Sequence, residues 1–353
     1  MISPEHEEVI SVWHRQSGLH VIIAIHSTVR GPALGGSRFR PYPTLDAAFA
    51  EACDLAQAMS YKAAVAQLPL GGGKAVLIGD PTVSKTTELL ADYAGVLNSL
   101  DGRYITAEDV GTTMADMDEL HEQTKFVAGT SIERGGSGDP SPHTAYGILC
   151  AMQAASAQLW GTRDLAGRHV AVSGLGKVGA EVARLLSQRG CKLTLADVSP
   201  RAVEAVIGHD AVAADVVDPD EVHRTKCDIF SPCALGGALN YRTVPELRCL
   251  AIVGAANNQL TSPELADDLS ARTIAYVPDF VANAGGIINI ANEYLGYDED
   301  RATKQVEQIF DTTQSILRRS AFEGTTPLAA AVALAKERLS TDQGLEVVTQ
   351  PAS

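Results

Sequence analysis

Two lysines are the residues of this chain whose setting points most directly to chemistry. Lys74 ends a glycine run at residues 71–73 and precedes four apolar residues, so it stands at the mouth of a predicted buried strand. Lys62 ends a helical stretch and continues an apolar stripe along one of its faces. The other members of this stripe are Ala48, Ala52, Leu55 and Met59. Both ammonium groups are therefore expected to point inward, near each other.

An inward lysine is stable only when it is paired or when its pKa falls, so these two lysines predict a site that handles an anion or a polarised oxygen. A phosphate-binding P-loop is excluded because Ala75 follows Lys74, where that motif requires Ser or Thr. The plainer interpretation, in which both side chains reach solvent along their apolar stems, stays open.

Two carboxylates end the next predicted strand, residues 103–109. Since α/β proteins place their chemistry at the carboxyl ends of strands, Glu108 or Asp109 is a candidate functional acid. An acid before a helix is often only a cap, and this alternative stays open for both. The inward lysines favour function, because a carboxylate needs nearby cations to stay ionised in a cleft. Thr113 and Asp116 match a capping box and predict the next helix.

A second constellation is a glycine pattern between a strand, residues 169–173, and a helix, residues 180–189. The pattern consists of Gly174, Leu175, Gly176, Lys177, Val178 and Gly179. A further strand, residues 191–196, leads to Asp197, which completes the dinucleotide fingerprint. The glycines admit a pyrophosphate to the helix N-terminus, and Asp197 accepts hydrogen bonds from the ribose. A carboxylate there favours NAD over NADP, a preference that the nearby Arg201 would weaken; a glycine turn that serves packing alone is the alternative.

Three further predicted strands end in small and polar residues, as expected for the crevice in which an open α/β sheet binds its ligand. Cys233 and Ala234 at the first end, and Asn257 at the second, are placed with the cofactor. Asn257 and Asn283, which follows the third strand, offer both hydrogen-bond donors and acceptors. Asparagines also commonly satisfy loop backbone, so that alternative stays open.

Composition limits the class of protein. The chain has 43 acidic and 28 basic residues, a net charge of −15, which argues against a nucleic-acid surface and for a cytoplasmic protein. No apolar stretch is long enough to cross a membrane, and the first residues show no signal-peptide pattern. The six cysteines lack Cys-x-x-Cys or zinc-ligand spacing, so we expect reduced, buried thiols and no metal site.

The length of 353 residues predicts two domains. The boundary is best placed in the glycine- and proline-rich residues 135–142. We expect an N-terminal α/β domain, residues 1–140, and a C-terminal Rossmann domain, residues 141–324, with a ligand cleft between them. A helix over about 325–353 is expected to pack back on the first domain.

Other segments are predicted from local pattern. Residues 19–28 indicate a strand, and the glycine-rich residues 31–38 indicate a turn region that approaches a ligand. Thr44 is expected to cap the helix that carries Lys62, and a further helix is expected near residues 84–100. The polar residues 342–353 are expected to fray.

Together these motifs resemble the glutamate/leucine/phenylalanine/valine dehydrogenases over nearly the whole chain. The matching segments are Gly31-Pro-Ala-Leu-Gly-Gly36, Met59-Ser-Tyr-Lys62, Leu70-Gly-Gly-Gly-Lys74, Tyr104-Ile-Thr-Ala-Glu-Asp-Val-Gly-Thr112, Ala115-Asp-Met-Asp118, Pro232-Cys-Ala-Leu-Gly-Gly237 and Ala282-Asn-Ala-Gly-Gly286. Within this family the sequence is most similar to leucine and valine dehydrogenases. The implied fold is the two-domain α/β amino-acid dehydrogenase with a Rossmann domain.

The resemblance implies a reversible, NAD-dependent oxidative deamination of an L-amino acid to its 2-oxo acid and ammonia. By motif, Lys62 would bind the substrate carboxylate and Lys74 would assist the attack of water on the iminium carbon. Asp109 would handle protons to and from the amino group. Asn257 and Asn283 would hold the nicotinamide side and the substrate amino group. The family also implies a homo-oligomer joined through the N-terminal domain, and closure of the cleft during turnover.

The side-chain pocket is the next expectation from the resemblance. Carried over from the leucine enzymes, it falls on Leu34, Ala107, Ile287 and Ile290, while the backbone of Gly36 lines the substrate site. These pocket residues include no cation, which disfavours glutamate. One methylene discriminates by only about 1–3 kcal/mol, so we predict a branched-chain substrate with overlap among valine, leucine and isoleucine. The alternatives are a phenylalanine- or tryptophan-type dehydrogenase of specialised metabolism, and a non-catalytic NAD-binding regulator.

Overall fold

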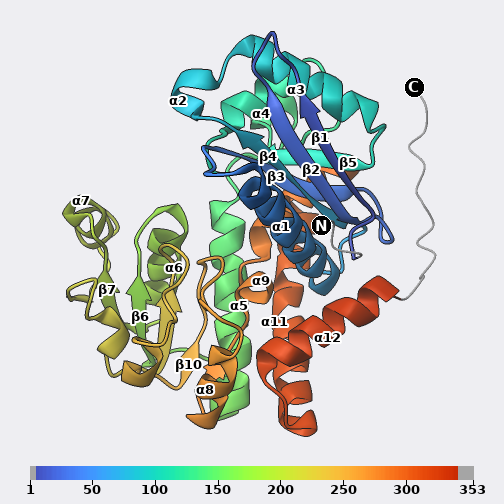
Figure 1. Ribbon diagram of the computed structural model, residues 1–353. Coiled ribbons are helices and arrows are strands. Elements are labelled where there is room, and N and C mark those ends of the chain that lie inside the picture. Colours follow the sequence, from blue (N-terminus) through green and yellow to red (C-terminus); the bar gives the residue numbers. More distant parts are fainter. Residues whose placement is uncertain (1–4, 341–353) are drawn as a thin grey trace. The chain divides into compact units, whose positions relative to one another are not determined.

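A computed structural model describes residues 5–340 of the chain (Figure 1). These residues divide into two compact units. The first contains the described residues up to Gly138, the segment Ile290–Tyr297 and the residues from Ala335 onward. The second contains Asp139–Asn289 and Asp298–Leu334. The predicted fraying of residues 342–353 lies outside the described residues.

The first unit is built on a five-stranded sheet in the order β1-β2-β4-β3-β5. Its strands are β1 (Glu8–Trp13), β2 (His20–Ser27), β3 (Ala33–Arg40), β4 (Gly71–Ile78) and β5 (Tyr104–Glu108). Strand β3 runs parallel to β4 and β5, whereas β2 is antiparallel to β1 and β4. The carboxyl ends of β3, β4 and β5 therefore lie at one edge of the sheet.

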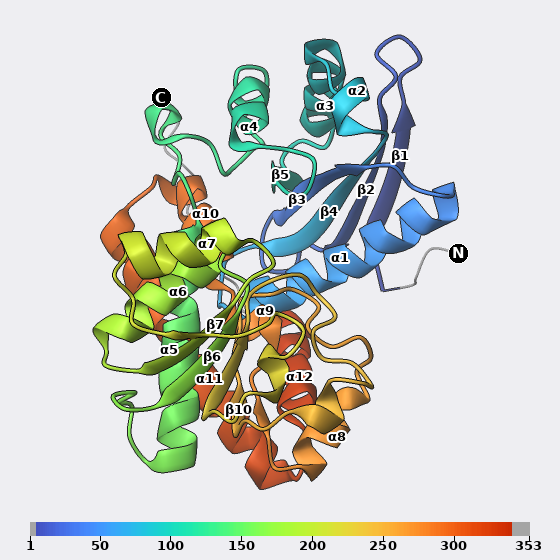
Figure 2. The same ribbon diagram turned by 90° about the vertical axis from the view of Figure 1, so that its left-hand side faces the viewer.

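Helices cover both faces of this sheet (Figure 2). They are α1 (Leu45–Val65), α2 (Pro81–Ser84), α3 (Thr87–Ser99) and α4 (Met114–His121). Strand β2 shows how the layers form, because its residues alternate between faces. Ile22 and Ala24 pack toward α1, whereas Ile23 and Ile25 join the core that α3 and α4 cover. The predicted caps at Thr44 and at the Thr113–Asp116 box are confirmed.

The glycine-rich residues 31–38 were expected to form a turn region, and this expectation is wrong, because most of them belong to strand β3. The glycines are needed for close approach instead. A Cβ at Gly35 would overlap the carbonyl of Gly73 on β4, and a Cβ at Gly36 would lie 2.8 Å from the Cβ of Asp109. Likewise, a Cβ at Gly72 would overlap the backbone of Ser60 on α1.

The predicted inward stripe of α1 is also partly wrong. Ala48 and Ala52 are buried as expected, but Leu55, Met59 and Lys62 are only half-buried. The buried line continues through small residues, Ala56, Ser60 and Ala63. Since α1 approaches the glycines of β4 so closely, only small side chains fit between helix and sheet, and the larger ones lie at the flanks.

The second unit is built on a six-stranded sheet in the order β11-β10-β9-β6-β7-β8. Its strands are β6 (His169–Ser173), β7 (Lys192–Ala196), β8 (Asp215–Val216), β9 (Ile229–Pro232), β10 (Ala251–Ile252) and β11 (Ala275–Tyr276). Every pair is parallel. Read from β8 to β11, the order is 3-2-1-4-5-6, that of a Rossmann fold, so the predicted fold class is confirmed. The strand order reverses between β6 and β9, where such folds bind their ligands.

The helices of the second unit surround this sheet (Figure 1). They include α5 (Ser141–Trp160), α6 (Lys177–Gln188), α7 (Pro200–Glu204), α8 (Leu265–Ala271), α9 (Asp279–Ala282) and α11 (Glu299–Glu323). Helix α5 packs along both α6 and α11. At the crossing with α11, a Cβ on Gly147 would lie 2.7 Å from Ile309 Cδ1, so glycine allows the close approach.

The chain passes from one unit to the other within two helices. These helices are α10 (Gly285–Ala291) and α12 (Pro327–Ser340), and α12 ends the described chain. Short 3-10 turns, and one π-helical turn at Ala205–His209, complete the list: η1 (Ile132–Arg134), η2 (Ala205–His209), η3 (Val222–Arg224), η4 (Val244–Glu246) and η5 (Asn292–Leu295). Within residues 5–340, no helix is long and apolar enough to cross a membrane.

Candidate functional site

Strand register brings Lys74 and Asp109 together in the first unit. Ser37 on β3 pairs with Ala75 of β4 on one side and with Glu108 of β5 on the other. Ala75, Ser37 and Glu108 thus form one row across the sheet. Lys74 precedes Ala75 and Asp109 follows Glu108, so each lies one residue from this row. Gly36 lies on β3 between these two strands, and a side chain there would collide with the Cβ of Asp109.

Lys74 and Asp109 form a buried ion pair, and Lys74 is only 5% exposed. Burial lowers the pKa of the Lys74 ammonium from its usual range, although the negative charge of Asp109 opposes that shift. Burial alone would raise the pKa of Asp109, but the positive charges of Lys74 and Arg38 outweigh burial and lower it. The arrangement thus offers an ionised carboxylate beside an amine that loses its proton more readily than a free lysine.

The backbone after β5 holds Asp109 in place. Its Oδ1 accepts a hydrogen bond of 2.7 Å from the Val110 N–H, and its own N–H donates to Thr112 Oγ1 at 2.9 Å. The Thr112 hydroxyl donates in turn to the Ser37 carbonyl at 2.8 Å. Of the two acids at the end of this strand, Asp109, to which the family resemblance assigned proton handling, pairs with Lys74.

Sequence reasoning missed two charged residues of this cluster. Arg38 Nε donates to Asp109 Oδ2 at 3.2 Å, and Arg38 Nη1 donates to Glu51 Oε1 at 2.6 Å. Strand alternation was the signal that could have found Arg38, because it lies two residues beyond Gly36 and so faces the same side. The expectation of a turn over residues 31–38 hid that signal.

The remaining predicted substrate residues lie in several elements. Leu34 on β3 and Ala107 on β5 are buried, at 2% and 5% exposure. Lys62 is half-buried in the last turn of α1. Ile287 is buried in α10 within the second unit, and Ile290 belongs to the first unit. Register places Gly36 opposite Ala107, and Leu34 opposite the neighbouring Ile105.

In the second unit, the loops after β6 and β9 meet where the strand order reverses. The Cys233 N–H donates to the Ser173 carbonyl at 2.7 Å. Gly174 has φ of +95°, and a Cβ there would lie 2.6 Å from the Ala234 nitrogen. A Cβ at Gly179 would lie 3.1 Å from that of Cys233. The fingerprint glycines therefore let two loops touch at the point where a dinucleotide is expected.

The N-terminus of α6 fits a pyrophosphate. Among the described residues no side-chain hydrogen bond caps this helix, and a Cβ on its N-cap residue Gly176 would meet no atom within 4 Å. The dipole of a helix N-terminus suits an anion, and there is room for one beside Gly176. Lys177 forms an ion pair of 3.0 Å with Asp139, Leu175 is buried and Val178 is half-buried. Asp197 accepts hydrogen bonds from the N–H groups of Leu175 and Ser199, at 2.6 and 2.7 Å.

Two asparagines form the other part of the second cluster. Asn283 is 6% exposed, and its Nδ2 donates to Asn257 Oδ1 at 2.9 Å and to the Ala255 carbonyl at 3.1 Å. Its Oδ1 is buried and accepts no hydrogen bond among the described residues. A buried acceptor without a donor fits the amide or ammonium group of a ligand. Together with the open N-terminus of α6, it shows that these residues fit a nicotinamide dinucleotide.

Gln259 is a further residue that the sequence did not mark. It is fully buried, and its Nε2 donates to the Gly254 and Ala256 carbonyls at 2.9 and 3.0 Å. These bonds brace the loop that presents Asn257. A glutamine at the end of a polar loop carries no distinctive sequence signal, because its contacts depend on how the loop folds back.

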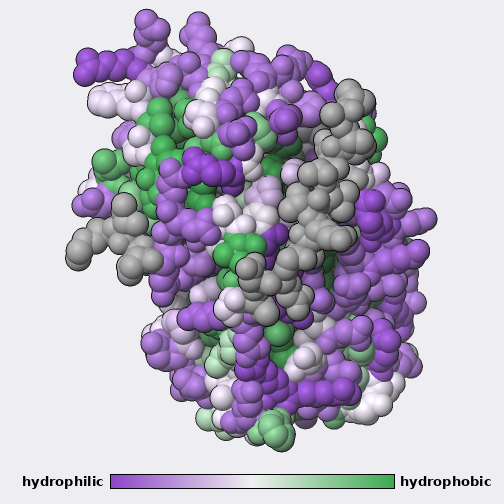
Figure 3. Space-filling view, turned by 90° about the vertical axis from the view of Figure 1, so that its right-hand side faces the viewer, coloured by the Kyte–Doolittle hydropathy of each residue, from purple (hydrophilic) through white to green (hydrophobic). Residues whose placement is uncertain are grey.

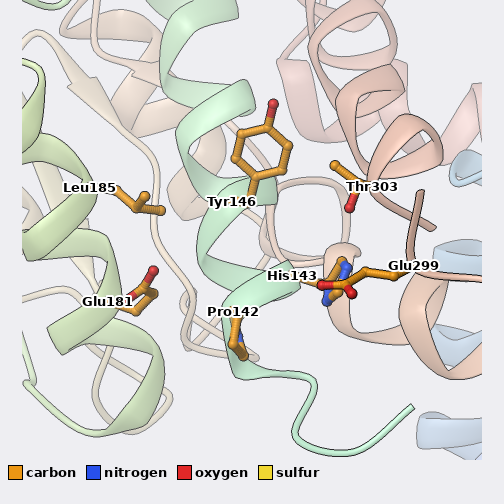
Figure 4. A pocket seen from close by; sticks show the side chains of 7 residues that line it. All are labelled: Pro142, His143, Tyr146, Glu181, Leu185, Glu299 and Thr303. Carbon is orange, nitrogen blue, oxygen red and sulfur yellow. The ribbon is translucent and has the colours of Figure 1, made fainter. Parts of the chain in front are cut away.

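A pocket of about 280 Å³ lies elsewhere in the second unit, among α5, α6 and α11 (Figure 4). It is lined by Pro142, His143, Tyr146, Glu181, Leu185, Glu299 and Thr303. None of the predicted site residues is among them. Among the described residues, no group of three His, Cys, Asp or Glu side chains could hold a metal ion.

A Rossmann sheet with its glycine loop, together with a buried lysine–carboxylate pair, defines the class of nicotinamide-dependent dehydrogenases. Comparison with known proteins identifies the family. The model of the Glu/Leu/Phe/Val dehydrogenase dimerisation domain matches residues 6–126, and that of the Glutamate/Leucine/Phenylalanine/Valine dehydrogenases matches residues 135–205 and 194–343. The chain belongs to this family of NAD(P)-dependent amino-acid dehydrogenases, as the sequence motifs predicted.

Individual relatives agree with this assignment. A leucine dehydrogenase of Bacillus cereus is 44% identical, over 96% of this chain and 92% of that protein. A valine dehydrogenase of Streptomyces virginiae is 46% identical, over 95% of this chain and 94% of that protein. Among solved structures, the L-tryptophan dehydrogenase from Nostoc punctiforme is 40% identical, with a TM-score of 0.86, over 96% of this chain and 97% of that chain.

Proposed function

We propose that this enzyme catalyses the reversible, NAD-dependent oxidative deamination of branched-chain aliphatic L-amino acids. One observation carries the proposal: the buried Lys74–Asp109 pair lies in a sheet whose neighbouring residues, Leu34 and Ala107, are apolar and buried. Such a site combines proton transfer with an apolar wall. The products are the 2-oxo acid and ammonia.

Three predicted site residues of the first unit, Lys62, Lys74 and Asp109, each have a proposed task. Lys62 binds the substrate carboxylate with its ammonium group. Asp109 Oδ2 accepts a proton from the substrate ammonium, so that its nitrogen lone pair can form the iminium as hydride leaves Cα. Lys74, in its neutral form, takes a proton from the water that attacks the iminium carbon. Asp109 then returns its proton to the nitrogen. As the C–N bond breaks and the carbonyl forms, the hydroxyl proton is released to solvent and the nitrogen leaves as ammonia.

The second unit supplies the cofactor site. NAD, when bound, accepts the hydride from Cα. Gly174, Gly176 and the N-terminus of α6 hold the pyrophosphate, and Asp197 holds the adenosine ribose. Asn257 and Asn283 hold the nicotinamide and the substrate amino group, with Asn283 Oδ1 as the open acceptor. NAD rather than NADP is proposed because the Asp197 carboxylate would repel a 2′-phosphate.

The substrate class rests on the apolar pocket residues and on the relatives. Leu34, Ala107, Ile287 and Ile290 carry no cation that could pair with a side-chain carboxylate. The relatives from Bacillus cereus and Streptomyces virginiae are leucine and valine dehydrogenases. The tryptophan dehydrogenase neighbour makes an aromatic amino acid the second candidate.

We further propose a homo-oligomer joined through the first unit, most of which matches a dimerisation domain. Strand β1 is an edge strand that pairs only with β2 among the described residues, and its Trp13 is 67% exposed. Apolar side chains gather on part of the surface that this unit forms (Figure 3). An unpaired edge beside apolar surface suits pairing with a second copy. The six free thiols support a reducing, cytoplasmic location.

The proposal is tested by NADH formation by purified enzyme with a panel of L-amino acids at alkaline pH. Valine, leucine and isoleucine are expected to be oxidised with kcat/KM values within about 100-fold of one another, because single methylenes discriminate weakly. NAD is expected to be preferred to NADP. Much faster turnover of tryptophan or phenylalanine would overturn the substrate assignment, and binding of NADH with no turnover of any amino acid would favour the regulator.

A further inference from the structure

Arg38 connects the Lys74–Asp109 pair to helix α1. Its Nε and Nη2 donate to the two oxygens of Asp109, at 3.2 and 3.4 Å, and its Nη1 donates to Glu51 on α1 at 2.6 Å. Nε contacts Oδ2, the same oxygen that Lys74 binds. A planar guanidinium can hold both oxygens of a carboxylate at once, which a point charge cannot do.

The sheet and helix geometry make this contact possible. Arg38 lies two residues beyond Gly36 on β3, so both face the same side of the sheet. Glu51 reaches Arg38 from α1, the helix on that face, and it also pairs with Arg40. Side chains of Arg38 and Glu51 are 22% and 20% exposed, so their charges are poorly screened.

We propose that Arg38 is a positioning residue for catalysis, which holds both oxygens of Asp109 beside Lys74 while Glu51 anchors its guanidinium to α1. The inference rests on the proposed roles of Lys74 and Asp109. It assigns to Arg38 an effect exerted through its neighbours, since the contacts that define it are with Asp109 and Glu51.

The charges around Lys74 predict opposite effects for the two outer residues. Asp109 after β5 and Glu51 on α1 raise the pKa of Lys74, whereas Arg38 on β3 lowers it; burial, the largest influence, also lowers it. Arg40 and Tyr42 act on Glu51. Removing the charge of Arg38 should therefore raise the pH at which Lys74 becomes neutral, and removing that of Glu51 should lower it.

Two tyrosines lie in the core that α3 and α4 cover, on the other face of the sheet from α1. Tyr104 on β5 packs against Gly73, and Tyr93 on α3 shares a hydrogen bond of 2.8 Å with Thr106. Burial raises the pKa of both phenols, so they stay neutral over the working range. The charged groups that face Lys74 are thus those on β3, on α1 and after β5.

The experiment compares pH profiles of kcat/KM for valine or leucine oxidation in Arg38→Gln, Arg38→Lys and Glu51→Gln. In Arg38→Gln the acidic limb should move to higher pH by about one unit, and kcat should fall about tenfold or more, because a neighbouring charge of this kind shifts a pKa by one to three units. Glu51→Gln should move the limb to lower pH. Arg38→Lys should keep the acidic limb at the pH of the parent enzyme but should not retain the full kcat. A lysine ammonium cannot donate to both carboxylate oxygens in the fixed planar geometry of a guanidinium.

Arg103→Gln is the matched control, since Arg103 pairs with Glu8 at the surface of the same unit and touches neither Asp109 nor Glu51 in the described structure. Its pH profile should match that of the parent enzyme. If Arg38→Gln lost activity but the acidic limb of its pH profile stayed at the pH of the parent enzyme, Arg38 would have only a structural role. Limbs moving in the same direction for Arg38→Gln and Glu51→Gln would also overturn the inference.

A measurement that does not need turnover separates this inference from the proposed function. Carbamylation of the Lys74 amine by cyanate, followed by peptide mass spectrometry across pH, reports its neutral fraction directly. Arg38→Gln should carbamylate at higher pH than the parent, whatever substrate the enzyme uses. If the parent oxidised no amino acid but this shift appeared, the electrostatic role would stand while the proposed reaction failed.

Discussion

The two candidate clusters of this protein use opposite means to handle charge. In the first unit, Lys74, Asp109, Arg38 and Glu51 alternate in sign and are largely withdrawn from water. In the second unit, the fingerprint glycines and the buried Asn283 present backbone N–H groups and neutral amides. The first cluster can move protons, whereas the second can only bind and orient.

The difference follows from what each cluster must do. A reacting amino acid needs groups that change protonation, and buried charges persist only when neighbouring charges and hydrogen bonds compensate their desolvation. A dinucleotide brings its own negative charges, so a helix N-terminus and neutral donors suffice. Substitutions in the two clusters should therefore damage different kinetic constants.

The largest expected effect is that of Lys74→Ala. Loss of a proton-transfer group should lower kcat/KM for amino-acid oxidation by about 10²–10⁴-fold. The affinity for NADH, measured by fluorescence titration, should change little, because the proposed cofactor-binding residues belong to the second unit and Lys74 to the first.

Lys85→Ala is the matched control, because Lys85 forms the other partly buried lysine–aspartate pair of the first unit, with Asp116 at 2.6 Å. It should lower the melting temperature slightly and leave kcat/KM within a few fold of the parent. Equal losses in both variants would mean that the Lys74 pair serves stability alone, and the contrast between clusters would break down.

A smaller effect, on binding, is expected from Gly174→Ala. Positive φ at a non-glycine residue costs about 1–3 kcal/mol, and the new Cβ would also collide with Ala234. We expect the loop to relieve this cost by leaving the conformation that binds the pyrophosphate, so that NADH must restore it and its affinity should fall by about 5- to 150-fold. Isothermal titration calorimetry would measure this change.

Gly161→Ala tests the conformational cost alone. Gly161 has φ of +72° at the C-terminus of α5, with no atom near its would-be Cβ. It should lower the melting temperature but leave NADH affinity unchanged. If Gly174→Ala bound NADH as tightly as Gly161→Ala, the fingerprint would be a packing turn, the alternative left open by the sequence.

The smallest expected effect is that of Asn283→Ala. Loss of one net hydrogen bond, worth about 1 kcal/mol, should lower kcat/KM by about five- to tenfold while the pH profile keeps its position. Steady-state kinetics across pH would measure both. An altered pH limb would show that Asn283 takes part in proton transfer, against the division of tasks between the clusters.

Asn240→Ala controls for the loss of an asparagine that only braces a loop. Asn240 Nδ2 donates to the Gly237 carbonyl at 3.0 Å, and its Oδ1 accepts from the N–H groups of Arg242 and Thr243. It should affect stability more than kcat/KM. The comparison isolates the contribution of the unpartnered Oδ1 of Asn283.

Local patterns in the sequence located the centre of the Rossmann unit. Strand β6, the glycine loop and helix α6 follow one another without interruption, so a short window contains the glycine fingerprint and the helix N-terminus behind it. The predicted strand 169–173 coincides with β6. Strand β1 and the two-residue β8 were not predicted, because short strands carry little periodic signal.

The first unit shows where local patterns fail. Glycines at residues 31–38 indicated a turn, yet they form β3, since the need for glycine arises from strands and a helix that approach from elsewhere in the chain. The stripe of α1 was misassigned for the same reason. Lys74 and Asp109 were found as candidates by type and position, but Arg38 and Glu51 were not.

The sequence by itself determined the family, the Rossmann fingerprint and the residue types available for chemistry, because these depend on motifs that are contiguous in the chain. Only the tertiary structure decided that Lys74 and Asp109 form an ion pair, and that Arg38 and Glu51 extend it through hydrogen bonds. Charge compensation and close packing depend on distances between segments far apart in sequence, and those distances exist only once β3, β4, β5 and α1 have come together.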